Sequence, residues 1–186
     1  MPSWQRHAKL GVLTAGFGVH MELGMIGLGR MGANMAERLV RGGHRAVGFD
    51  PGTEARALAA SKGIEPVTSL EALVAALPTP RRLWIMVPAG QPVDDTLARL
   101  LPLLAPGDTV VEGGNSFYKD TMRRGEMLAA QGIHYVDCGT SGGVWGLAEG
   151  YSLMIGGDVA AVDALTPLFA TLAPATDRGW ARAGPS

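Results

Sequence analysis

The chain has little of several features that mark particular classes of protein. Its 186 residues include one cysteine, Cys138, which excludes an internal disulfide and suits a reducing cytoplasm. No apolar run reaches the roughly 18 residues that a membrane-spanning helix needs. The net charge of −1 gives no reason to expect a nucleic acid or a membrane as partner. We therefore expect a cytoplasmic globular domain, with 47% hydrophobic residues to form its core.

Residues 1–20 lack the pattern of any regular element. Basic residues stand before an apolar patch at 10–19, which is an order that a signal peptide also shows. The glycines within the patch, and a strand that follows it at once, favour a disordered tail or a translation start upstream of Met21. We expect residues 1–20 to be a disordered or spurious extension and 21–186 to be the folded domain.

Glycine, by contrast, is abundant, with 27 residues, and three glycines follow a short apolar run in a fixed order. Residues 23–26 read as a buried strand, and Gly27, Gly29 and Gly32 then form the pattern G-x-G-x-x-G. Residues 31–41 carry apolar side chains on one stripe, which predicts a helix. Strand, glycines and helix together are typical of a turn that binds a dinucleotide, whereas the glycines alone would be weak support.

Each part of this unit has a physical reason in dinucleotide binding. Gly27 permits a tight turn, Gly29 leaves room for a pyrophosphate, and Gly32 lets the helix pack closely on the strand. The free N–H groups at the start of the helix then face the phosphates. A second apolar run ends on Asp50, which is 50 − 29 = 21 residues after the second glycine, where a carboxylate can accept from ribose hydroxyls. Asp50 therefore favours NAD, although Arg30 or Arg56 could accommodate NADP.

Strands and helices alternate through the rest of the chain with short turns between them. We expect further strands at 64–67, 83–87, 109–112, 133–136 and 152–155, and helices at 53–61, 68–77, 92–101, 118–130 and 158–172, with Leu58 facing inward. This order predicts an α/β fold with a doubly wound, mainly parallel, Rossmann-like sheet. Ligands bind beyond the carboxyl ends of such strands. The loops at 27–32, 87–90, 113–116 and 139–143 therefore form the candidate site.

Two of these loops carry polar groups suited to a small polar substrate. Asn115 offers both a donor and an acceptor, although it or Ser116 could simply cap the following helix. Residues 140–143 supply hydroxyls and open backbone N–H groups, which suit a carboxylate or sugar hydroxyls, although they could also form an ordinary turn.

Four phrases in order resemble the decarboxylating 6-phosphogluconate dehydrogenases of the shorter bacterial type. They are Gly27-Leu-Gly-Arg-Met-Gly-Ala-Asn-Met-Ala36, Met86-Val-Pro-Ala-Gly90, Glu112-Gly-Gly-Asn-Ser116 and Asp137-Cys-Gly-Thr-Ser-Gly-Gly-Val-Trp-Gly146. Other β-hydroxyacid dehydrogenases share the first and last phrases more loosely, so one of those enzymes is the alternative. A catalytically dead nucleotide-binding fragment is a further alternative.

The resemblance assigns roles to residues that match the family's motifs. The pyrophosphate would be cradled by Gly27, Leu28, Gly29, Arg30, Met31 and Gly32. Val87, Pro88 and Ala89 would lie along the nicotinamide, Asn115 between nicotinamide and sugar, and Ser141, Gly142 and Gly143 at the substrate carboxylate. The implied reaction oxidises 6-phosphogluconate with NAD or NADP and releases carbon dioxide and ribulose 5-phosphate, without a metal.

The family's catalytic lysine and glutamate have no match among these residues. They would follow a Gly-Pro-containing stretch, and this chain reads Arg182-Ala-Gly-Pro-Ser186 at its end. The family's large helical domain, which also builds its homodimer, would come next. We therefore expect the chain to be the cofactor-binding portion, without catalytic residues of its own, and its dimerisation is doubtful.

Overall fold

A seven-stranded sheet forms the centre of the protein. The computed structural model describes residues 19–143 and 145–175, so most of the segment 1–20, expected to be disordered or spurious, lies outside the described residues. The strands are β1 (Glu22–Ile26), β2 (Arg45–Phe49), β3 (Glu65–Val67), β4 (Arg82–Ile85), β5 (Thr109–Glu112), β6 (His134–Ser141) and β7 (Ser152–Gly157). Their order is β3-β2-β1-β4-β5-β6-β7, and all neighbours pair in parallel except β6 and β7.

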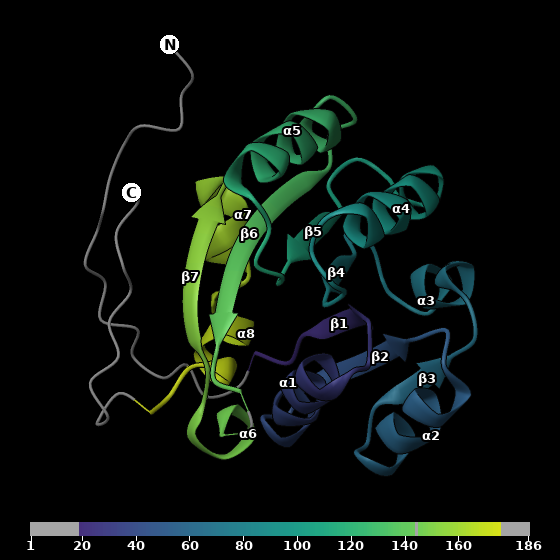
Figure 1. Cartoon of the computed structure of the whole chain (residues 1–186), viewed down its shortest axis with the longest axis vertical. Helices are drawn as coiled ribbons and strands as arrows, with labels where there is room; N and C mark the ends of the chain where they lie inside the picture. The colour runs from purple at the N-terminus through teal and green to yellow at the C-terminus, as the bar shows by residue number, and fades with distance from the viewer. Residues whose placement is uncertain (1–18, 144, 176–186) are drawn as a thin grey trace.

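Helices cover both faces of the sheet (Figure 1). They are α1 (Arg30–Arg41), α2 (Thr53–Ser61), α3 (Leu70–Ala75), α4 (Gln91–Leu100), the 3₁₀ turn η1 (Leu101–Leu103), α5 (Tyr118–Ala129), α6 (Gly146–Glu149), α7 (Val159–Ala164) and α8 (Thr166–Leu172). This confirms the expected doubly wound, Rossmann-like α/β fold. None of the helices in the described ranges is long and apolar enough to cross a membrane.

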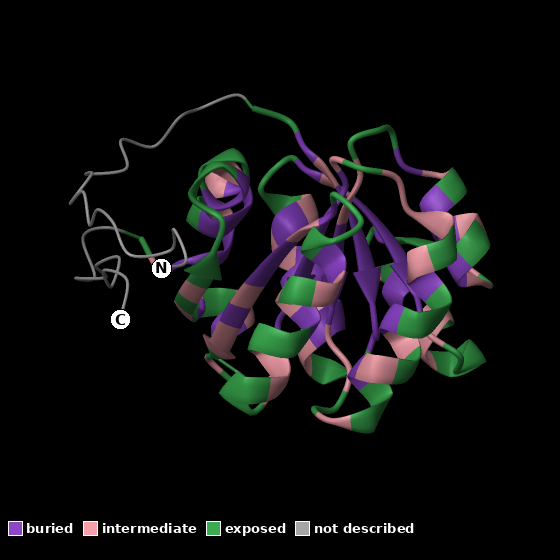
Figure 2. Ribbon diagram, turned by 90° about the horizontal axis from the view of Figure 1, so that it is seen from above, coloured by how far each residue is buried: buried purple, intermediate pink, exposed green. Residues whose placement is uncertain are grey.

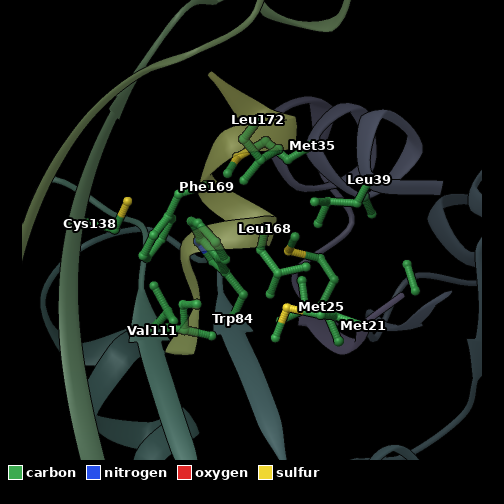
Figure 3. Packing of buried hydrophobic residues seen from close by; sticks show 14 of the residues in the cluster. Met21, Met25, Met35, Leu39, Trp84, Val111, Cys138, Leu168, Phe169 and Leu172 are labelled. Atoms are coloured by element: carbon green, nitrogen blue, oxygen red, sulfur yellow. The ribbon is translucent and has the colours of Figure 1, made fainter. Parts of the chain in front are cut away.

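Two apolar clusters, one on each side of the sheet, form the core. One cluster joins the strands to α1, α2, α7 and α8, and the other joins them to α3, α4 and α5. In the first, Trp84 of β4 packs edge-on against Phe169 of α8, and Met35 and Leu39 of α1 belong to the same cluster, with Met35 next to Leu172 (Figure 3). The inner strands β1, β2, β4 and β5 are almost entirely buried, whereas the edge strands β3 and β7 and the outer faces of the helices are exposed (Figure 2). The inner strands therefore read as nearly continuous apolar runs, because both of their faces are covered.

The structure corrects three details of the expected elements. Leu58 is 57% exposed, and the neighbouring Ala59 is the buried residue of α2. The last helix is two helices, α7 and α8, separated at Leu165, and Pro167 lies in the first turn of α8, where a proline is tolerated. Strand β6 continues to Ser141 rather than ending at 136, because β7 pairs with it residue by residue to that point.

Candidate functional site

The turn between β1 and α1 requires glycine at two positions for structural reasons. Gly27 has a φ of 92°, and a Cβ there would lie 2.5 Å from the carbonyl oxygen of Met86. A Cβ at Gly32 would lie 2.0 Å from the carbonyl oxygen of Gly27, so α1 could not approach the strand as it does. These two glycines build the turn, as their places in the motif predict.

Gly29 has no such structural reason. Its backbone is extended, with φ −62° and ψ −178°, which any residue adopts. A Cβ at this position would meet no heavy atom of the described chain within 4 Å. The position faces open space at the N-terminus of α1, where unpaired N–H groups favour an anion. The fold tolerates a side chain here, so the space that glycine leaves is available to a ligand.

Asp50 holds the glycine turn from the end of β2. Its Oδ2 accepts from the N–H of Leu28 at 2.9 Å, and its Oδ1 accepts from the N–H of Gly52 at 2.8 Å. Each carboxylate oxygen keeps a second lone pair for a ribose hydroxyl. Arg56 donates to the carbonyl oxygens of Asp50 and Pro51, at 2.6 and 2.9 Å. These bonds orient the guanidinium toward the backbone.

A cleft of about 370 Å³ opens beyond the ends of β1, β2 and β4. From β1 the chain adds β2 and β3 on one side of the sheet and then β4 on the other side, so the strand order reverses between β1 and β4. Open α/β sheets bind ligands at such a switch point. The cleft is lined by Ile26, Gly27, Gly29, Phe49, Asp50, Pro51, Leu70, Met86, Val87, Pro88, Pro92, Thr96 and Arg99.

Five of the predicted cofactor residues therefore meet in this cleft: Gly27, Gly29, Asp50, Val87 and Pro88. The other predicted residues of the glycine turn contribute differently. Leu28 buries its side chain in the core and offers its N–H to Asp50, Met31 packs partly against the core, and Arg30 is exposed. Ala89 is exposed just outside the lining of the cleft.

The sequence reasoning missed eight residues of this cleft. Ile26, Phe49, Pro51 and Met86 each adjoin a predicted residue, whereas Leu70, Pro92, Thr96 and Arg99 come from other elements. Leu70 begins α3, and the other three belong to α4. The residues of α4 could have been predicted from their place in the chain, because the helix that follows β4 begins next to the cleft. Its residues at i, i+4 and i+7, counted from Pro92, share one helix face.

The loop after β5 packs directly against the loop after β4. The N–H of Gly113 donates to the carbonyl oxygen of Ile85 at 2.9 Å. A Cβ at Gly113 would lie 2.3 Å from the sulfur of Met86, and one at Gly114 would lie 3.5 Å from the carbonyl oxygen of Val87. Asn115 is exposed at the tip of this loop and lies outside the lining of the cleft.

A buried polar network lies beneath this loop, and the sequence reasoning did not predict it. Glu112 is 0% exposed and accepts from the hydroxyls of Ser116, at 2.8 Å, and Tyr135, at 3.0 Å. Arg124 of α5, also 0% exposed, donates to Ser116 at 2.9 Å. No local pattern indicates this network, because its members are 4 to 23 residues apart along the chain.

The predicted substrate residues lie at the far end of β6. The segment 139–143, expected as a loop, is strand as far as Ser141, which pairs with Ser152 of β7. The pairing of β6 with β5 ends at Asp137, four residues earlier, so Ser141 stands about 13 Å further along the strand at 3.3 Å per residue. Ser141, Gly142 and Gly143 are outside the lining of the cleft in the described part of the chain.

The side chain of Tyr151 is buried against the turn that follows β6. A Cβ at Gly142 or Gly146 would lie within 2.7 Å of its ring, so both positions require glycine. Burial raises the pKa of the Tyr151 phenol to about 12, which keeps it neutral. Arg38 of α1 donates to the carbonyl oxygen of Leu147 at 3.0 Å, which ties this turn to the helix of the glycine motif.

Three titratable groups of β6, Tyr135, Asp137 and Cys138, have raised pKa values, and burial is the first cause in each. Burial, and secondarily the carboxylate of Glu112, raise the pKa of Asp137 to about 6. Burial raises the pKa of the Cys138 thiol to about 12, so the thiol is not the reactive nucleophile that a lowered pKa would make it.

Comparisons with known proteins agree with this geometry. The family described as the NAD binding domain of 6-phosphogluconate dehydrogenase matches residues 22–179. An NAD(+)-dependent, decarboxylating 6-phosphogluconate dehydrogenase of Haloferax volcanii is 48% identical over 157 residues, which are 84% of this chain and 52% of that protein. A putative 6-phosphogluconate dehydrogenase of Bacillus subtilis is 41% identical over 164 residues, which are 88% of this chain and 54% of that protein. The chain thus spans about half the length of these curated relatives.

Two solved structures share the fold. Plasmodium falciparum 6-phosphogluconate dehydrogenase, solved in apo form and with NADP+ and 6-phosphogluconate, superposes with a TM-score of 0.79 at 25% identity, over 83% of this chain and 34% of that one. Mycobacterium tuberculosis 3-hydroxyisobutyrate dehydrogenase superposes with a TM-score of 0.77 at 28% identity, over 83% of this chain and 53% of that one.

Proposed function

The chain belongs to the family of the NAD binding domain of 6-phosphogluconate dehydrogenase, and from this premise we propose that its site serves the oxidative decarboxylation of 6-phosphogluconate. The observation that supports the proposal most is Gly29, a glycine that the fold does not require and that faces open space at the start of α1. The pyrophosphate would lie there, the adenosine ribose at Asp50, and the nicotinamide beside Val87 and Pro88.

We propose NAD as the preferred cofactor because of Asp50. Its carboxylate is held in place by two backbone N–H groups, so it cannot swing away from a 2′-phosphate. Two like charges 4 Å apart repel by about 4 kcal/mol at an effective dielectric of 20, and less where water screens them. Arg56 is held by backbone carbonyls and is poorly placed to neutralise that phosphate. The 48% identical relative is named as NAD(+)-dependent, which supports the same preference.

The substrate would bind beside the nicotinamide, with Asn115 toward its hydroxyls and Ser141, Gly142 and Gly143 toward its carboxylate. Hydride would pass from C3 of the sugar acid to the cofactor, and the resulting β-keto acid would lose carbon dioxide. The base and acid for these steps are assigned by the resemblance to a lysine and a glutamate that residues 1–186 do not match. We therefore propose that these residues bind the cofactor and the substrate but do not catalyse the reaction by themselves.

A short β-hydroxyacid is the competing substrate, because 3-hydroxyisobutyrate dehydrogenase shares the fold at a similar TM-score. Calorimetric titration of the NADH-saturated protein with 6-phosphogluconate and with 3-hydroxyisobutyrate separates the two. We expect heat only with 6-phosphogluconate, and the Asn115→Ala variant should bind it less tightly. Binding of 3-hydroxyisobutyrate alone would assign the chain to the other substrate. Steady production of NADH from 6-phosphogluconate, abolished by Asn115→Ala, would require a base within these residues.

A further inference from the structure

One buried guanidinium joins the two loops on the nicotinamide side of the site. Arg124 lies on α5 and its side chain is 0% exposed. Its Nε donates to Oδ1 of Asp94 at 2.9 Å, its Nη2 to the carbonyl oxygen of Gly90 at 3.1 Å, and its Nη1 to Oγ of Ser116 at 2.9 Å. Glu112, also fully buried, is 3.4 Å from the same Nη1. All three nitrogens of the guanidinium are therefore engaged.

The partners of Arg124 come from two neighbouring segments, one that follows β4 and one that follows β5. Gly90 and Asp94 belong to the loop after β4 and the first turn of α4, directly after Val87, Pro88 and Ala89. Ser116 follows Asn115 in the loop after β5. Gly90 has a φ of 89° and precedes α4, so the orientation of its carbonyl group sets the path of the chain from the nicotinamide loop into the helix. Arg124 fixes that carbonyl relative to the neighbouring loop.

Stability alone is a poor explanation of this arrangement. A buried ion pair adds little over well-packed apolar residues of the same volume, because both charges lose their water. The adjacent Arg123 also pairs with Asp94, at 3.0 Å, but its side chain is 54% exposed and bonds to neither loop. Two neighbouring arginines thus share one carboxylate, and only the buried one connects the loops.

We propose that Arg124 is a positioning residue that holds the loops after β4 and β5 at the spacing which the nicotinamide half of the cofactor requires. This inference rests on the proposed function, which puts the nicotinamide beside Val87 and Pro88 in the loop after β4, next to the substrate at Asn115 in the loop after β5. A lysine would keep the charge but has one nitrogen on a flexible stem, so it cannot reproduce a planar fork that reaches three partners. The adenosine and diphosphate half of the cofactor, at Gly29 and Asp50, is independent of the fork.

The test compares two ligands that differ by the nicotinamide. The affinities of NADH and ADP-ribose are measured by calorimetry for the wild type, for Arg124→Lys and for Arg123→Lys, which is the matched control. We expect the wild type to bind NADH more tightly than ADP-ribose. Arg124→Lys should lose at least about fivefold in NADH affinity and less than about twofold in ADP-ribose affinity, whereas Arg123→Lys should change neither. A role in stability alone would weaken both ligands together.

Ser116→Ala provides a second, milder variant, because it removes the hydroxyl that joins Arg124 to the loop after β5 while the buried charges stay paired. It should show the same selective loss of NADH affinity, with ADP-ribose unaffected. Equal losses for both ligands, or no loss in either variant, would overturn the positioning role. A wild type that binds neither ligand would instead refute the proposed function and would be recognised before any variant is made.

Discussion

Replacing Gly29 with valine should strongly weaken cofactor binding and leave the fold intact. The backbone at Gly29 is extended, with φ −62° and ψ −178°, a conformation that a β-branched residue favours. The added Cβ meets no heavy atom of the described chain within 4 Å. Replacing glycine at such a compatible position stabilises a protein by about 0.4–1 kcal/mol, because the unfolded chain loses freedom. Gly29 is also the N-cap of α1, where glycine is preferred to valine, and this preference offsets the gain. The midpoint of thermal unfolding should therefore change little.

The bound pyrophosphate, in contrast, would collide with the new side chain. We expect NADH affinity to fall at least about tenfold, which corresponds to about 1.4 kcal/mol. NADH fluorescence titration and thermal denaturation of the same preparation measure both quantities. Gly156→Val is the matched control, since a Cβ at Gly156 of β7 also meets open space, but away from the cleft. Unchanged affinity in a folded Gly29→Val protein, or an equal loss in Gly156→Val, would refute the reasoning.

Three further predictions concern the charge and titration of named side chains. Asp50→Ser should narrow the preference for NAD over NADP by removing the charge that repels the 2′-phosphate; an unchanged ratio of dissociation constants would locate the discrimination elsewhere. The pKa of Asp137 is raised to about 6 by burial and Glu112. Its protonation therefore stabilises the fold fully below the unfolded value of about 3.9, and that stability is lost as pH rises through about 6. Asp137→Asn should thus have a free energy of unfolding higher than that of the wild type by about 1–3 kcal/mol at pH 7.5, and this difference should close toward pH 4. Denaturant titrations measure it, and a difference that does not vary with pH would contradict this reasoning. Cys138 is fully buried with its pKa raised to about 12, so a thiol reagent at pH 8 should label it only after denaturation; rapid labelling of the native protein would show that β6 opens.

The glycine turn and Asp50 could be predicted from sequence because their geometry is local. The turn, the helix start and the carboxylate lie within one strand–helix–strand unit, and each residue type is limited by backbone conformation or by close approach. The predicted positions of Gly27, Gly29 and Asp50 in one cleft follow from the parallel order of β1 and β2. The order of strands along the chain was likewise sufficient for the fold class.

Features that depend on distant partners could not be predicted in this way. Arg124 reads as a surface residue of an amphipathic helix, and only Asp94 and Glu112, 30 and 12 residues away, explain its burial. Ser141 reads as part of a loop, and only its pairing with β7 extends the strand to it. Leu58 was expected to face inward, but the contact of α2 with the rest of the fold places Ala59 against the core and leaves Leu58 exposed.

The most direct test of the account is an NMR titration of the ¹⁵N-labelled protein with NAD. If the dinucleotide binds at the turn between β1 and α1, the amide resonances of Gly29, Arg30 and Met31 should shift most, together with that of Gly52, whose N–H is bonded to Asp50. The resonances of β7 should stay in place. Shifts confined to β7, or no shifts at millimolar NAD, would contradict the assignment of this cleft as the cofactor site.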